Sequence, residues 1–233
     1  MKAHIITVPD RSAPLRRLVH SFSLCKSIDQ VTIHIDHEYK GPWFNTLQAL
    51  TVIASGTEIC LIAQDDIKPL PTAIDAHINV LKGHLADPIG LISLFTPPRK
   101  EFQEISEKGF DGFNDNNFLW AQFYMISPDF AQDVIECNKL IDRAKAKYHD
   151  EVRFRFAAQK YKKRIVTLCH SFARHDLSVK STLGTPSSIG SVVRDTKSIA
   201  SVDQSFEALN LKIRNSANDL HLEIGRASCR ERV

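Results

Sequence analysis

The sequence lacks any apolar run of the roughly 18–20 residues that a membrane-spanning helix needs. Its five cysteines, at positions 25, 60, 137, 169 and 229, show neither a CxxC pattern nor the Cys/His spacing of a zinc site. The GxGxxG fingerprint of dinucleotide-binding folds is also missing. We therefore expect a cytoplasmic protein with reduced cysteines and no transmembrane segment, whose first residues form a strand rather than a signal peptide.

Neither sign of charge is in large excess. The formal net charge is +3 over 233 residues, which gives no reason to expect a nucleic-acid partner. Hydrophobic content of 43% and charged content of 24% are ordinary for a globular protein. Hydrophobic density falls after position 185. We therefore predict one domain over 1–185, a loosely attached extension over 186–222 and a non-native tail over 223–233.

Strand-like and helix-like segments alternate along the chain. Short β-branched or apolar runs at 4–8, 31–36 and 58–64 predict strands, and apolar residues at helical spacing separate them. Further strands are predicted at 88–95, 118–126 and 164–169, and helices at 12–22, 43–54, 71–86, 129–143 and 151–161. This alternation is typical of parallel βαβ units. We therefore expect an α/β fold with a mostly parallel central sheet and flanking helices, in a Rossmann-like three-layer arrangement.

Two adjacent carboxylates, Asp65 and Asp66, come directly after the apolar run 59–63. Ionised carboxylates side by side repel each other, and a bound divalent cation is one reason for them to coexist. Mg²⁺ prefers carboxylate oxygens and keeps open positions for phosphates. The alternative is a solvated turn after a strand. Ligands of open parallel sheets bind beyond the carboxyl ends of the strands, so we expect Asp36 and the Pro9–Arg11 segment at the same edge.

A strand that ends in an acidic motif, after a βαβαβ unit, resembles the GT-A-fold glycosyltransferases. The resemblance covers roughly 3–184 and is to the small glycosyltransferase-like proteins of phages and bacteria. It implies a Mn²⁺ or Mg²⁺ cofactor, a nucleotide-diphosphate sugar donor such as a UDP-sugar, and a glycan, lipid or protein acceptor. The sugar, the stereochemical outcome and the oligomeric state stay open.

The resemblance also implies roles around the acidic motif. Asp66 would bind the metal, Asp65 would lie beside the sugar, and Gln64 would lie near the ribose or base. Gln64 departs from the family pattern, which has an acid at this position.

Four residues earlier in the chain would contact the nucleotide, namely Pro9, Arg11, Asp36 and Asn45. Three of them also have a plain structural explanation. Arg11 can be a surface arginine, Asp36 can cap a loop, and Asn45 can cap a helix.

Two late segments complete the resemblance. Asp150 or Glu151 would be the general base that deprotonates the acceptor, although an acid before a helix is also a common N-terminal cap. His175 would complete the metal site, with His170 as the competing candidate. The polar loop 99–117 would lie over the site.

Two other functions remain open. A sugar-1-phosphate nucleotidyltransferase shares this kind of sheet, but it would need a glycine-rich loop after the first strand, and residues 8–14 contain no glycine. A catalytically inactive module that binds nucleotide sugars is the second alternative, because of Gln64 and because the identity of the base is undecided.

Overall fold

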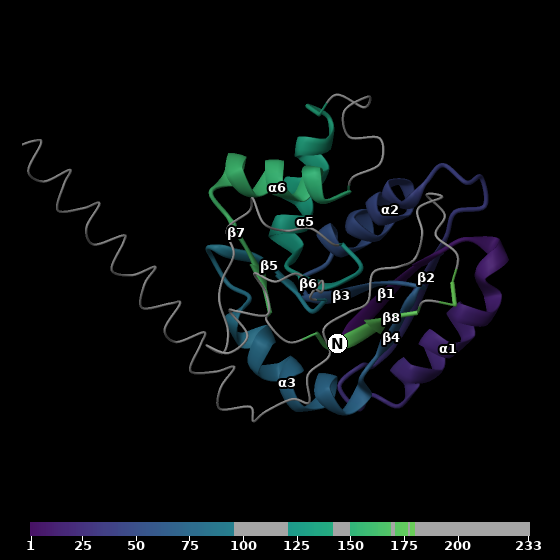
Figure 1. Ribbon diagram of the computed structural model, residues 1–233. Helices are drawn as coiled ribbons and strands as arrows, with labels where there is room; N and C mark the ends of the chain where they lie inside the picture. Colours follow the sequence, from purple (N-terminus) through teal and green to yellow (C-terminus); the bar gives the residue numbers. More distant parts are fainter. Residues whose placement is uncertain (96–120, 142–149, 169–170, 177, 180–233) are drawn as a thin grey trace, which may run out of the picture.

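The computed structural model describes residues 1–95, 121–141, 150–168, 171–176 and 178–179 (Figure 1). The strands are β1 (Lys2–Thr7), β2 (Gln30–Ile35), β3 (Cys60–Gln64), β4 (Ile67–Pro69), β5 (Ile89–Ser93), β6 (Phe123–Ile126), β7 (Arg164–Thr167) and β8 (Ala173–His175). The helices are α1 (Ser12–Ser23), α2 (Pro42–Ala54), α3 (Pro71–His84), α5 (Pro128–Asn138) and α6 (Asp150–Tyr161), with a 3-10 turn, η1 (Pro9–Arg11). The predicted loop 99–117, His170 and the segments 186–222 and 223–233 lie outside the described residues.

Six strands form the central sheet, in the order β2-β1-β3-β6-β5-β7. The pairs β1–β2, β1–β3 and β5–β7 are parallel, which confirms the prediction of a mostly parallel sheet. β6 runs antiparallel to both of its neighbours, a direction that the sequence pattern did not indicate. A second sheet pairs β4 with β8, two strands of three residues that were not predicted.

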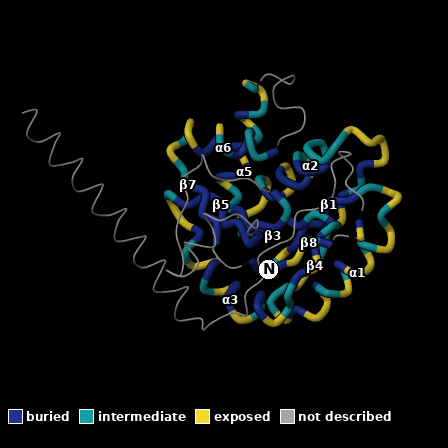
Figure 2. Tube along the Cα trace, in the orientation of Figure 1, coloured by how far each residue is buried: buried dark blue, intermediate teal, exposed yellow. Residues whose placement is uncertain are grey.

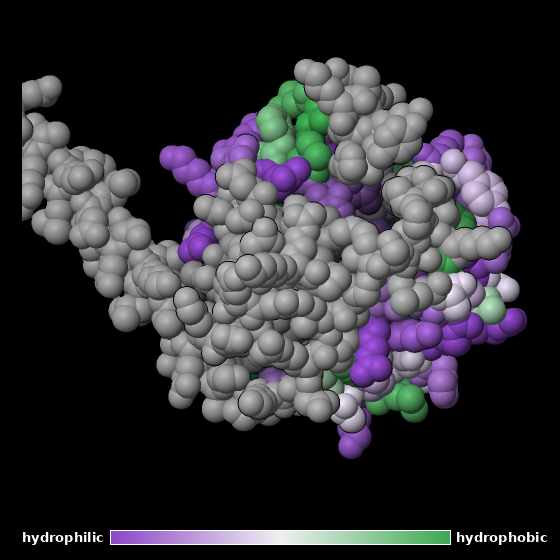
Figure 3. All heavy atoms as spheres, viewed as in Figure 1, coloured by the Kyte–Doolittle hydropathy of each residue, from purple (hydrophilic) through white to green (hydrophobic). Residues whose placement is uncertain are grey.

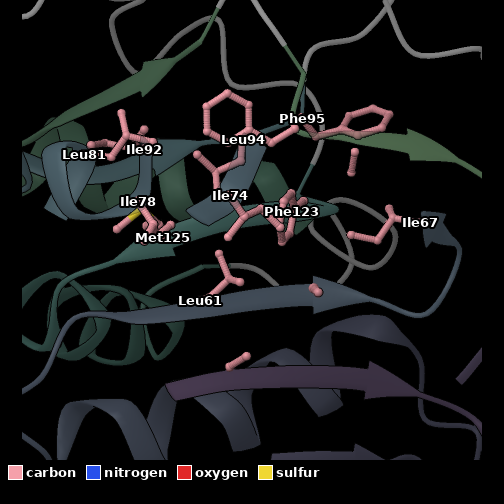
Figure 4. Close-up of a cluster of buried hydrophobic side chains, with 14 of the residues drawn as sticks. Leu61, Ile67, Ile74, Ile78, Leu81, Ile92, Leu94, Phe95, Phe123 and Met125 are labelled. Atoms are coloured by element: carbon pink, nitrogen blue, oxygen red, sulfur yellow. The ribbon is translucent and has the colours of Figure 1, made fainter. Parts of the chain in front are cut away.

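Helices cover both faces of the central sheet, so the fold has three layers (Figure 1). On one face, α1 and α3 pack on the sheet through apolar residues such as Phe22, Ile74 and Ile78. Figure 4 shows Ile74 and Ile78 beside Phe123 and Met125 of β6. On the other face, α2, α5 and α6 bury Leu50, Phe130 and Phe154, among others. Burial is concentrated in the sheet that these helices enclose (Figure 2).

Local sequence explains where several of these elements begin. Proline stands at the first helical position of α2, α3 and α5, where a backbone N–H would have no partner within the helix, so its absence costs no hydrogen bond. Ser127 caps α5 by accepting a hydrogen bond from the Phe130 amide at 3.3 Å. Within the described part of the chain, no helix combines the length and the apolarity that crossing a membrane requires.

Candidate active site

The carboxyl ends of β1, β2 and β3 meet at one edge of the sheet. The register pairs Thr7 with Ile35 and Ile6 with Gln64, so the residues that follow each strand come together. Two further amides extend this pairing beyond the strands, since Asp36 N donates to Thr7 O at 3.0 Å and Asp65 N donates to Ile6 O at 3.1 Å. The expected shared edge is therefore present.

Asp65 is a buried, internally paired carboxylate. Its Oδ1 accepts from Arg11 Nη1 and its Oδ2 from Thr7 Oγ1, both at 2.5 Å, and the residue is 2% exposed. Burial raises the pKa of Asp65, although the hydrogen bonds from Thr7 and Arg11 oppose that rise. Arg11 thus reaches Asp65 from the η1 turn, whose first residue, Pro9, is exposed. Asp65 holds η1 against the strand ends, which is a structural role.

Asp36 and Asn45 each present one buried oxygen at this edge. Asp36 Oδ2 accepts a hydrogen bond from the Gly41 amide at 2.8 Å. Gly41 has a φ of +106°, a conformation that glycine adopts readily and that turns its amide N–H toward Asp36. Asn45 donates its side-chain amide to Thr7 O at 2.7 Å and to His34 O at 3.3 Å, so it ties β1 to β2. The other oxygens, Asp36 Oδ1 and Asn45 Oδ1, are buried and accept no hydrogen bond from any residue that the structure describes.

Buried acceptors without donors are uncommon in folded proteins and call for a physical explanation. A ligand that carries N–H or O–H groups, such as a base or a ribose, would satisfy these two oxygens. Each of these two predicted nucleotide contacts therefore has one acceptor oxygen that no described residue satisfies.

Asp66 faces His175, which β8 brings from 109 positions later in the sequence. The β4–β8 pairing places His175 opposite Ile67, next to Asp66. The distance from Asp66 Oδ2 to His175 Nε2 is 3.4 Å, and these side chains are 13% and 10% exposed. Asp66 Oδ1 is buried and has no hydrogen-bond partner among the described residues. Asp66 therefore differs from Asp65 in having a carboxylate oxygen that no described residue satisfies.

The Asp66–His175 pair has suitable chemistry for a divalent cation. Neighbouring ligands of an octahedral cation at roughly 2.1 Å lie about 3 Å apart, close to the observed separation. Mg²⁺ and Mn²⁺ accept carboxylate oxygen, and Mn²⁺ also accepts imidazole. Over the described ranges, no group of three or more His, Cys, Asp or Glu side chains gathers as a metal cage. A cation held by Asp66 and His175 would take its other ligands from water and phosphate oxygens.

Asp150 begins α6 and is buried against α2. Its Oδ2 lies 3.1 Å from Thr46 Oγ1, which also lies 3.0 Å from Pro42 O. The threonine has one hydroxyl proton for these two acceptors, whereas a protonated Asp150 can itself donate to Thr46. Burial, with a smaller contribution from the Glu151 charge, raises the pKa of Asp150 to about 7. Asp150 can therefore take up or release a proton near neutral pH.

Glu151 connects α6 to the same edge of the sheet. Its Oε1 accepts from the Ala121 amide at 3.1 Å, and the next residue, Gln122, accepts from Gln64 N at 2.8 Å. The antiparallel β6 starts at this edge, so Glu151 is separated from the end of β3 by one short backbone segment. The predicted residues of β3 and α6 thus belong to one region.

One buried acid in this region was not predicted. Asp176 follows His175, donates its amide to Asp66 O at 2.6 Å, and binds Arg17, Lys68 and Ser178 through its carboxylate. Burial alone would raise the pKa of Asp176, but these hydrogen bonds outweigh it and hold the pKa well below its usual range. No signal in the sequence indicated a special role of Asp176, because an acid two positions before Ser178 is typical of an ordinary Asx turn.

A scan against known protein families and a search of curated proteins found no match for this chain. Several solved structures have a similar shape. One, described as a glucose-1-phosphate thymidylyltransferase from Bacillus anthracis in complex with sucrose, has a TM-score of 0.46 and 8% identity, and the match covers 75% of this chain and 89% of that one.

Two more resemble the chain at a similar level. A glycosyltransferase involved in glycosylation of the major capsid of PBCV-1 has a TM-score of 0.44 and 11% identity, over 73% of this chain and 83% of that one. An apo UDP-glucose pyrophosphorylase has a TM-score of 0.42 and 12% identity, over 91% of this chain and 81% of that one. At these identities and scores the likeness is one of general shape.

Proposed function

We propose that this chain is a divalent-cation-dependent glycosyltransferase that moves a sugar from a nucleotide diphosphate to an acceptor. The observation that carries the proposal is the Asp66–His175 pair at the carboxyl edge of the sheet, with an unpartnered carboxylate oxygen on Asp66. Asp36 and Asn45 support it, because each has a buried acceptor oxygen at the same edge.

Each residue would have the role that its side-chain chemistry suits. Asp36 and Asn45 would accept hydrogen bonds from the base or ribose of the donor. Asp66 and His175 would hold Mg²⁺ or Mn²⁺, which when bound stabilises negative charge on a diphosphate leaving group. Asp65 would act indirectly, because its bonds to Thr7 and Arg11 fix the backbone from which Asp66 extends.

Asp150 is the proposed general base. An acceptor hydroxyl oxygen would bond to the anomeric carbon of the donor sugar while the bond to the diphosphate breaks. The hydroxyl proton would pass to Asp150, whose pKa of about 7 suits proton transfer near neutral pH. Glu151 would hold the segment before β6 in place through the Ala121 amide.

Calorimetry with Mn²⁺ and a panel of UDP-sugars tests the proposal. We expect metal-dependent binding of at least one donor by the wild type, no metal-dependent binding by Asp66→Ala, and slow release of UDP from the bound donor. Absence of binding to every donor, or equal binding by Asp66→Ala, would refute the proposal. Binding without any transfer or UDP release would instead identify a sugar-nucleotide-binding module.

The neighbouring aspartates supply a matched control for folding. Asp65→Asn breaks a buried ion pair with Arg11 and should lower the free energy of unfolding by about 3 kcal/mol. Asp66→Asn weakens only the long contact of 3.4 Å between Oδ2 and His175 Nε2 and leaves the unpartnered Oδ1 position as it was, so it should change the free energy of unfolding by less than about 1 kcal/mol. Urea unfolding of both variants therefore separates the structural aspartate from the proposed ligand.

A further inference from the structure

A basic cluster lies on the two short strands, β4 and β8, that also carry His175. The β4–β8 register places Lys68 directly opposite Arg174, and both residues are exposed. Side chains that oppose each other across antiparallel strands project from the same face, with Cβ atoms about 5 Å apart. α1 packs along β4 and contributes Arg17 (Figure 1). Figure 3 shows hydrophilic residues gathered in the region of α1, β4 and β8.

A buried carboxylate fixes two of these three cations. Asp176 Oδ2 accepts from Arg17 Nη2 at 2.8 Å, and Asp176 Oδ1 lies 2.9 Å from Lys68 Nζ. Asp176 is 2% exposed, whereas the side chains of Arg17 and Lys68 are 50% and 54% exposed. The carboxylate is therefore enclosed, and the cationic groups that it orders remain open to solvent.

The charges of this cluster do not balance. Arg17 and Lys68 share one carboxylate, that of Asp176, and the Arg174 side chain forms no ion pair or hydrogen bond with any part of the chain that the structure describes. Like charges directly opposite each other on neighbouring strands destabilise a sheet. The fold thus carries an electrostatic cost here that an additional anion would remove.

We propose that Arg17, Lys68 and Arg174 form a binding site for a phosphate group. Arginine offers a planar fork of donors that matches phosphate oxygens, and lysine adds a mobile point charge. Successive side chains of a strand point to opposite faces, so the exposed pair of Lys68 and Arg174 projects from the face of the β4–β8 sheet opposite to that of Ile67 and His175. The phosphate can belong to the donor diphosphate or to a second, phosphorylated ligand. The site itself does not depend on the transfer reaction.

Titration with inorganic phosphate at constant ionic strength, followed by amide NMR, tests the site. We expect saturable shifts at the amides of Lys68 and Arg174 without metal. Lys68→Met and Arg174→Met keep much of the apolar stem but lose the charge, so each should weaken phosphate binding at least about tenfold. Arg16→Gln removes an exposed charge from the adjacent position of α1 and should change binding less than about twofold.

A charge reversal separates binding from folding. Arg174→Glu places a carboxylate opposite Lys68, so it should abolish phosphate binding while the melting temperature stays the same or rises. A large fall in melting temperature would mean that Arg174 stabilises the fold by itself, and it would overturn the argument from unbalanced charge.

Competition with UDP and Mn²⁺ identifies the source of the phosphate. Competition assigns the site to the donor diphosphate, and simultaneous binding assigns it to a second ligand; both outcomes support the site. Phosphate binding without UDP binding would support this site and count against the proposed transferase alone.

Three results would overturn the site. The first is the absence of saturable shifts, and the second is equal weakening by Arg16→Gln and Lys68→Met. The third is charge-dependent binding to phosphatidylglycerol vesicles without saturable phosphate binding, which would indicate a membrane-contact surface.

Discussion

Replacing Asp150 with asparagine should stabilise the fold increasingly as the pH rises above about 4, and it should strongly slow sugar transfer. Asp150 is buried at the start of α6, and burial raises its pKa from 3.8 to about 7. The folded state therefore holds a proton on Asp150 between about pH 4 and pH 7, where the unfolded chain has lost it. The free energy of unfolding falls as the pH rises through this range, and the full loss is present above pH 7.

The size of the effect follows from the two pKa values. At 1.36 kcal/mol per pH unit, the difference between 3.8 and about 7 corresponds to about 4 kcal/mol. Asparagine is always neutral, and its amide can still donate to Thr46 Oγ1. Asp150→Asn should therefore be more stable than the wild type by up to about 4 kcal/mol at pH 8, and by almost nothing at pH 4. Loss of the proposed base should lower kcat at least about 100-fold.

Urea unfolding between pH 4 and 9 measures this difference directly. Asp129→Asn is the matched control, because it makes the same change in the first turn of α5 at an exposed position. Its stability should stay within about 1 kcal/mol of the wild type. If Asp150→Asn is no more stable than the wild type at pH 8, or if its advantage does not grow between pH 5 and 8, the assignment of a buried, proton-binding Asp150 is wrong.

Two further predictions concern the fold alone. Burial, with the charges of His34 and Lys2, lowers the pKa of His4 from 6.5 to about 4. The free energy of unfolding should therefore fall by up to about 3 kcal/mol as the pH drops through that range. Urea titrations at pH 7 and pH 4 should show that His4→Phe loses most of this pH dependence. Gly90→Ala should lower the free energy of unfolding by about 1–3 kcal/mol, because a Cβ there would lie 2.4 Å from Phe130 Cγ. The same change at helical Gly83, where a Cβ meets nothing within 4 Å, should leave the melting temperature equal or higher.

Much of the fold could be predicted because its signals are local. The strands of the βαβαβ unit are apolar or β-branched runs, and the helices between them have apolar residues at helical spacing. β4 and β8 escaped prediction because three residues are too few to show a period, and β4 ends in a proline. The antiparallel direction of β6 was also not predictable, since strand direction follows from how the chain returns to the sheet.

The candidate site was predictable as a region but not in its division of roles. The rule that ligands lie beyond the carboxyl ends of parallel strands brought Asp36, Asp65 and Asp66 to one edge. The sequence pattern favoured Asp66 over Asp65 only through the family resemblance. The physical difference is that Thr7 and Arg11 occupy both oxygens of Asp65, and neither contact is visible in the local sequence.

The sequence by itself determined the alternation of strands and helices, and with it the edge where the acidic residues gather, because both depend on neighbours within a few positions. Only the tertiary structure decided which side chains meet there. His175 reaches Asp66 through the pairing of two short strands, and Asp176 orders Arg17 and Lys68. Burial against α2 raises the proton affinity of Asp150. These properties depend on distance and solvent exclusion, which arise only when remote segments pack together.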